Sequence, residues 1–260
     1  MKLSFVKISI RFILLALALP MTHCAFGQDE LTELTVDRPG FADTPFTVPS
    51  GMYQFEFGFD YFKRPTGEFY NLPVGMLRTG ISKRSEIRVS TRHILDNTDG
   101  NSFKGITPLS LGVKMHVIKE RKWIPETDIM TNVIIPMSET TSQSSKLGYE
   151  VLLLFQHDFY PNTALNYNIG YVWDSFQGKS VFTVSVCFNY LPTRRIGLYI
   201  EYFGFGQNKW PGEQGFDGGI TYLLAPNFQV DISSGVSRLE DKNNFFASSG
   251  FTFRINPIKE

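Results

Sequence analysis

The sequence predicts an all-β protein: a transmembrane, up-and-down antiparallel β-barrel of about 12 strands that follows a cleaved signal peptide. Three observations support this prediction. Apolar and polar residues alternate with a period of two along the chain, short and long connections follow one another in turn, and the N-terminus has the pattern of an export signal.

The export signal comes first in the chain. Basic residues precede a short apolar run at 12–19, and Ala25-Phe26-Gly27 then offers the small-x-small pattern that signal peptidase cleaves. We expect residues 1–27 to be a Sec signal peptide, with cleavage before Gln28; acylation of Cys24 is the alternative. The predicted location is the outer membrane of a Gram-negative-type bacterium.

Composition limits the possible functions of the exported chain. The net charge is zero, and removal of 1–27 leaves 22 basic and 25 acidic residues, so no nucleic acid partner is expected. Cys187 would then be the single cysteine, which excludes an internal disulfide. No later stretch reaches 18 apolar residues, the length of a membrane-spanning helix.

The first strand, 53–61, shows the alternation most clearly. Tyr53, Phe55, Phe57, Phe59 and Tyr61 occupy one face, and the residues between them are polar or glycine. The other segments with the same pattern are 74–81, 87–91, 109–117, 127–135, 147–159, 165–173, 182–190, 196–202, 216–224, 228–233 and 251–255. The second strand is started at Val74, because Pro73 lacks the N–H that a strand ladder needs.

The connections distinguish a membrane barrel from a soluble sandwich. The connections at 82–85, 118–122, 160–163, 191–195 and 225–227 are tight, whereas those between them are longer and polar, including the first at 63–69 and the last at 240–244. This regular order is typical of short periplasmic turns and longer outer loops. Aromatic residues near the strand ends suit the membrane interfaces. The alternative is a soluble, exported β-barrel or sandwich whose apolar face forms the core.

The predicted organisation has four parts. After the signal peptide, residues 28–50 form an extended periplasmic segment, 51–256 the barrel, and 257–260 a C-terminal tail. The segment contains three prolines and little periodicity, and it is either a flexible leader or a small plug in which Asp37 and Arg38 enter the lumen. The expected partners are the lipid bilayer, the barrel-assembly machinery and a small-molecule solute.

The segment TVDRPGFADTPFTVPSG at 35–51 carries a family resemblance, together with MYQFEFGFDYF, NLPVGMLRTGISKRSEIRVS and ITPLSLGVKM after it. It resembles the family labelled "putative MetA-pathway of phenol degradation", and the similarity continues to the C-terminus. The resemblance implies an outer-membrane β-barrel that passes small, in part aromatic, compounds. Barrels of this type end on an aromatic residue, whereas the last strand here ends at Ile255 after Phe251 and Phe253.

The residues that alternation points into the lumen include many charges. The expected selectivity residues are Glu86, Arg88, Arg92, Lys114, Glu150, Glu201 and Asp231. They either create an electrostatic field that selects solutes or form ion pairs that only stabilise a narrow barrel. Phe203 and Phe205 are the expected constriction.

No catalytic chemistry is expected. None of His93, His116 and His157 has a serine two positions away, and no histidine or cysteine cluster has metal-ligand spacing. We therefore predict no enzyme, no metal and no cofactor. The predicted function is a channel for small solutes through the lumen, and the alternative is a closed barrel that acts through its outer loops.

Overall fold

A computed structural model describes residues 33–98, 102–106, 109–135, 147–174, 179–207 and 212–257. The predicted signal peptide lies outside these residues, as do 28–32 of the segment and most of the tail. The strands are β1 (Tyr53–Arg64), β2 (Gly67–Ser82), β3 (Ser85–Thr98), β4 (Phe103–Ile106), β5 (Leu109–Ile118), β6 (Glu126–Ile135), β7 (Gly148–Tyr160), β8 (Thr163–Asp174), β9 (Lys179–Tyr190), β10 (Ile196–Gly206), β11 (Glu213–Ala225), β12 (Phe228–Leu239) and β13 (Lys242–Ile255).

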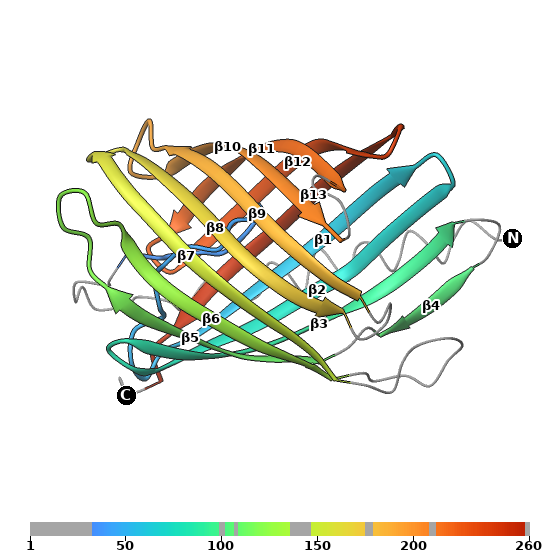
Figure 1. The fold of residues 1–260 in the computed structure, drawn as a ribbon. Coiled ribbons are helices and arrows are strands. Elements are labelled where there is room, and N and C mark those ends of the chain that lie inside the picture. Colours follow the sequence, from blue (N-terminus) through green and yellow to red (C-terminus); the bar gives the residue numbers. More distant parts are fainter. Residues whose placement is uncertain are drawn as a thin grey trace, which may run out of the picture. The chain divides into compact units, whose positions relative to one another are not determined.

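The strands close into an antiparallel barrel of twelve, which confirms the predicted fold class (Figure 1). Apart from β4, each strand pairs with the barrel strands before and after it in the chain, so β3 pairs with β5, and β1 pairs with β13 to complete the ring. The short β4 is an addition that alternation did not predict, and it pairs only with β3. Closure leaves the twelve barrel strands without a free edge.

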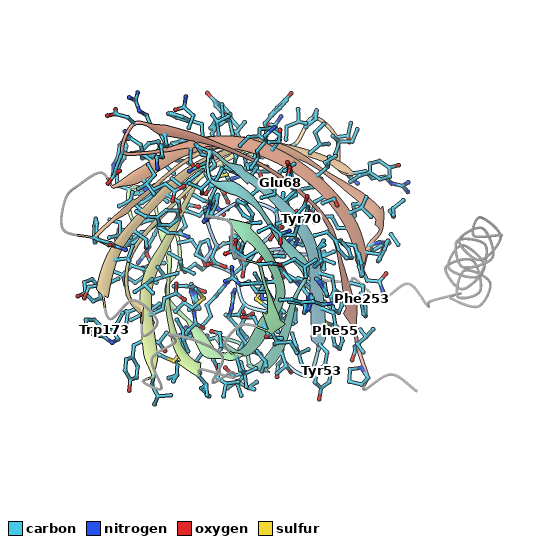
Figure 2. The ribbon with its side chains drawn as sticks, turned by 90° about the vertical axis from the view of Figure 1, so that its right-hand side faces the viewer. Tyr53, Phe55, Glu68, Tyr70, Trp173 and Phe253 are labelled. Carbon is cyan, nitrogen blue, oxygen red and sulfur yellow. The ribbon has the colours of Figure 1, made fainter. Side chains whose placement is uncertain are left out.

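The barrel has its apolar side chains on the outside. In β1, Gln54 and Glu56 are buried, while Tyr53 and Phe59 are exposed. Among the buried residues that the structure describes, polar and charged side chains outnumber apolar ones. Tyr53, Phe55, Trp173 and Phe253 lie on the outer side of the wall (Figure 2). A wall of this kind is stable where lipid contacts the outside, so the soluble alternative is wrong.

Two expectations about strand ends are wrong. The second strand begins at Gly67 rather than Val74, since the strand tolerates Pro73 at a bulge between Asn71 and Val74 where the ladder shifts. The first and last connections are not long loops: β1 and β2 are joined by Pro65 and Thr66, and β12 and β13 by 240–241. In both hairpins the strands continue through residues that the sequence presents as loop.

The two ends of the barrel are distinguished by the connections that they carry. We call the end with the β2–β3, β5–β6, β7–β8, β9–β10 and β11–β12 connections the turn end, and the opposite end the loop end. The chain enters β1 and leaves β13 at the turn end. No helix in the described part of the chain has the length and apolar character needed to cross a membrane.

Candidate channel lumen

Residues 33–50, which precede β1, fold into the lumen at the turn end and contact the wall. We call them the N-terminal segment. Ser50 pairs with Gly80 of β2 in a parallel bridge, and Val48 is fully buried. The backbone N–H of Val48 donates to Glu86 Oε2 at 2.6 Å. These contacts hold the end of the segment against β2 and β3.

Asp37 is the centre of a buried ion-pair network between this segment and three wall strands. Its Oδ2 atom lies 3.1 Å from Arg78 Nη1 of β2 and 2.8 Å from Lys114 Nζ of β5, and it also pairs with Arg88 of β3. The side chain is 1% exposed. Three cations from consecutive wall strands thus converge on one carboxylate of the segment.

The cations of this network are also bound to the wall and to the segment backbone. Arg78 contacts Glu56 Oε1 at 2.9 Å and Glu86 Oε1 at 2.8 Å. Lys114 Nζ donates to the Thr44 carbonyl oxygen at 2.9 Å. Since buried charges are stable only with partners, this pairing explains how so many of them coexist in a narrow lumen.

Two carboxylates of the segment, Asp37 and Asp43, have opposite pKa shifts. Burial raises the pKa of Asp37, but Arg78, Lys114 and Arg88 outweigh it and hold this pKa well below its usual range. Among the described residues, Asp43 forms an ion pair with Arg88 alone, at 3.0 Å. Burial, partly offset by Arg88, raises the pKa of Asp43 to about 6.

Arg38 anchors the segment to the seam where the barrel closes. Its Nη2 atom lies 3.2 Å from Asp231 Oδ1 of β12 and donates to Ser248 Oγ of β13 at 2.8 Å. The guanidinium fits a notch formed by two glycines that face each other in register, Gly58 and Gly250. A β-carbon at either glycine would overlap the Arg38 side chain, so the notch exists only without side chains there.

The tip of the segment crosses to the opposite wall. The backbone N–H of Phe41 donates to Glu201 Oε2 of β10 at 2.6 Å. The Phe41 ring lies 4.1 Å from that of Phe203 and 5.7 Å from those of Phe205 and Phe246. We call these four aromatic residues the waist, because their rings meet where the segment reaches the opposite wall.

The cavity toward the loop end of the barrel has a volume of about 530 Å³. We call it the loop-end cavity. Its charged lining residues are Asp43, Arg88, Arg92 and Glu150. The rest of its wall contains the apolar residues Val74, Met76, Ile94, Met130, Ile134, Val172, Val181 and Phe205, together with the uncharged polar residues Ser90, Thr91, Ser110, Asn132 and Thr183. A molecule in this cavity would contact apolar groups over most of its surface and charged groups at one side.

The cavity on the turn-end side, about 780 Å³, lies between the N-terminal segment and β7–β12. We call it the turn-end cavity. Amide side chains are prominent in its lining, at Gln156, Asn162, Asn166, Asn189 and Gln229. The lumen therefore contains two chambers of different chemistry, one toward each end of the barrel.

The predicted selectivity residues occupy three places. Glu86, Arg88 and Lys114 belong to the Asp37 network, Arg92 and Glu150 line the loop-end cavity, and Glu201 and Asp231 bind the segment from the opposite wall. Glu150 accepts a hydrogen bond from Asn132. The predicted constriction residues Phe203 and Phe205 lie at the waist.

Sequence reasoning did not identify Phe41, Asp43 or the apolar lining of the loop-end cavity. A signal for the lining was present, because alternation fails near the loop ends of β6, β8 and β9. There Ile134, Val172 and Val181 are apolar at positions that face the lumen. No local pattern marks Phe41.

A closed barrel with an apolar outside and a charged, partly filled inside is the architecture of an outer-membrane β-barrel. The described residues contain no group of three or more His, Cys, Asp and Glu side chains able to hold a metal. The chain belongs to the family described as "Putative MetA-pathway of phenol degradation", whose model matches residues 36–255.

Among solved structures, the chain is similar to an outer membrane channel from Pseudomonas putida F1. The two are 8% identical with a TM-score of 0.61, and the match covers 84% of this chain and 99% of that one. A toluene transporter from Ralstonia pickettii has a TM-score of 0.47 and 9% identity, with 80% and 90% covered. No curated protein matches the sequence.

Proposed function

We propose that this protein is an outer-membrane channel that passes small solutes through its lumen, rather than an enzyme. The observation that carries the proposal is the pair of cavities inside the barrel, one toward each end. The family membership and the barrel shared with the channel from Pseudomonas putida F1 agree with this role.

The apolar wall of the loop-end cavity favours solutes with an apolar body. Glu150 and Arg92 are the charges best placed for electrostatic selection, since both line this cavity. Glu86 has a different role in the proposal: its side chain is fully buried and bound to Arg78 and Val48, so it holds the segment. The N-terminal segment then acts as a partial plug that narrows the path.

The contact between Phe41 and Phe203 favours a second candidate, a barrel closed at the waist that acts through its outer loops. Single-channel recording of refolded protein in a planar bilayer separates the two. The channel proposal expects discrete openings, with an ion preference that changes in E150Q and not in the surface variant E68Q. Silence from protein shown to be folded and inserted would refute conduction and leave the closed barrel.

A further inference from the structure

The turn-end cavity carries a strip of amide side chains from three adjacent strands. We call Gln156, Asn166, Asn168 and Asn189 the amide strip; the first two and Asn189 line the cavity, and Asn168 lies beside them just outside its lining. Gln156 of β7 and Asn166 of β8 are direct partners in register. Asn189 of β9 donates to Asn166 Oδ1 at 3.4 Å. Asn168 follows Asn166 on the inner face of β8, one step closer to the waist.

The strip offers hydrogen-bonding capacity that the described protein does not use. Asn168 is 4% exposed, and neither its Oδ1 nor its Nδ2 atom has a hydrogen-bond partner among the described residues. The Thr163 hydroxyl, which lines the same cavity, is likewise buried without one. Because buried polar groups in proteins are almost always paired, such a cluster indicates a place where a polar ligand is received.

The chemistry of the lining specifies which ligand. A carboxamide both donates and accepts, so it matches hydroxyl and carboxamide groups, which do the same. The charged lining residues are Glu33, Arg38 and Asp158. Arg38 is already paired with Asp231, and an anion would meet two carboxylates. A volume of about 780 Å³ suits one small molecule.

We propose that the amide strip is a binding subsite for uncharged solutes that carry a hydroxyl or carboxamide group. This inference rests on the proposed function for its place in transport, since the strip would receive the polar group of a solute on the turn-end side of the waist. The binding itself does not depend on conduction. The class that the subsite selects is therefore neutral amphiphiles rather than ions or pure hydrocarbons.

Equilibrium dialysis of radiolabelled benzamide against the folded, detergent-solubilised full chain tests the subsite. Benzoate and benzylammonium, which have the same ring and a charged group, are the comparison probes. We expect saturable benzamide binding, weakened about fivefold in N166L for the loss of one hydrogen bond. The surface variant E68Q should bind like the wild type. The isosteric N166D should instead gain affinity for benzylammonium.

Equal binding of benzamide to wild type and folded N166L, or tighter binding of benzoate than of benzamide, would overturn the inference. Planar-bilayer recordings with the same probes separate it from the proposed function. If benzamide interrupts the openings of the wild type, and interrupts those of N166L less, the result supports both the subsite and the channel. A silent barrel that still binds benzamide through Asn166 would refute conduction alone.

Discussion

Replacement of Asp37 by Asn should release the N-terminal segment from the lumen without unfolding the barrel. The change keeps the shape of the side chain and removes the charge on which Arg78, Arg88 and Lys114 converge. Three cations would remain close together with one carboxylate fewer. The barrel ladder does not include Asp37, so the twelve strands should stay paired.

The magnitude follows from the burial of this carboxylate. At 1% exposure solvent screens the pairs little, and loss of one partner of a buried pair costs about 3–5 kcal/mol. The observable loss cannot exceed the docking free energy of the segment, because the segment then leaves and water reaches the cations. The equilibrium constant for docking of the segment should therefore fall by up to roughly 10²- to 10³-fold.

Hydrogen exchange of backbone amides in the segment measures this loss. The N–H groups of Phe41, Thr44 and Val48 donate to Glu201, Asp37 and Glu86, so in the wild type their exchange reports undocking. In D37N we expect faster exchange at all three, with unchanged protection of amides in β8. Asp43→Asn is the matched control, since Asp43 contacts one cation and should cause a much smaller change.

Unchanged exchange at Phe41 and Val48 in a folded D37N barrel would show that the Asp37 ion pairs do not hold the segment in the lumen. The network would then be a consequence of docking by other contacts rather than its cause. Loss of protection throughout the strands would also contradict the prediction, because it would show that the segment is required for the barrel itself.

Three further predictions concern other parts of the molecule. Gly58→Ala should displace Arg38 and speed exchange in the segment, whereas Gly75→Ala, whose β-carbon would meet only Phe57 at ordinary contact distance, should not. The pKa of Asp43 is about 6 when docked against an ordinary 3.8, so its contribution to docking is full below pH 3.8 and lost as the pH rises through 6. Protection of the segment amides, which is the exchange rate corrected for the intrinsic effect of pH, should therefore fall from pH 4 to 7 in wild type and lose that component in D43N. Phe59→Lys on the lipid face should lower the free energy of unfolding in bilayers by about 2–4 kcal/mol in urea titrations, while Phe59→Leu should change it little.

The barrel was predictable from the sequence because lipid enforces the alternation locally. In β1, each aromatic residue next to Gln54 or Glu56 already indicates which face meets lipid and which meets the lumen. The same logic placed the seven selectivity residues inside. It failed at Pro73, since a bulge removes the need for the missing N–H, and at the two hairpins whose polar residues continue the ladder beyond the apolar band.

What local patterns could not supply is the partner of each inward charge. Asp37 meets Lys114 across 77 positions of the sequence, and Arg38 meets Ser248 across 210. These contacts depend on closure of the ring, which brings β1 beside β13 and fixes the volume left for the segment. The sequence therefore allowed either a leader or a plug for the segment, and only the closed barrel shows how it fits.

We expect the N-terminal segment to set the narrowest passage of the lumen at Phe41. The most direct test of this expectation is the size of the largest polyethylene glycol that enters the channel and lowers its single-channel conductance, compared between wild type and Phe41→Ala. The variant should admit larger polymers from the turn end and conduct more, because it lacks the Phe41 ring that packs against Phe203. The same polymer cut-off and conductance in both proteins would contradict it.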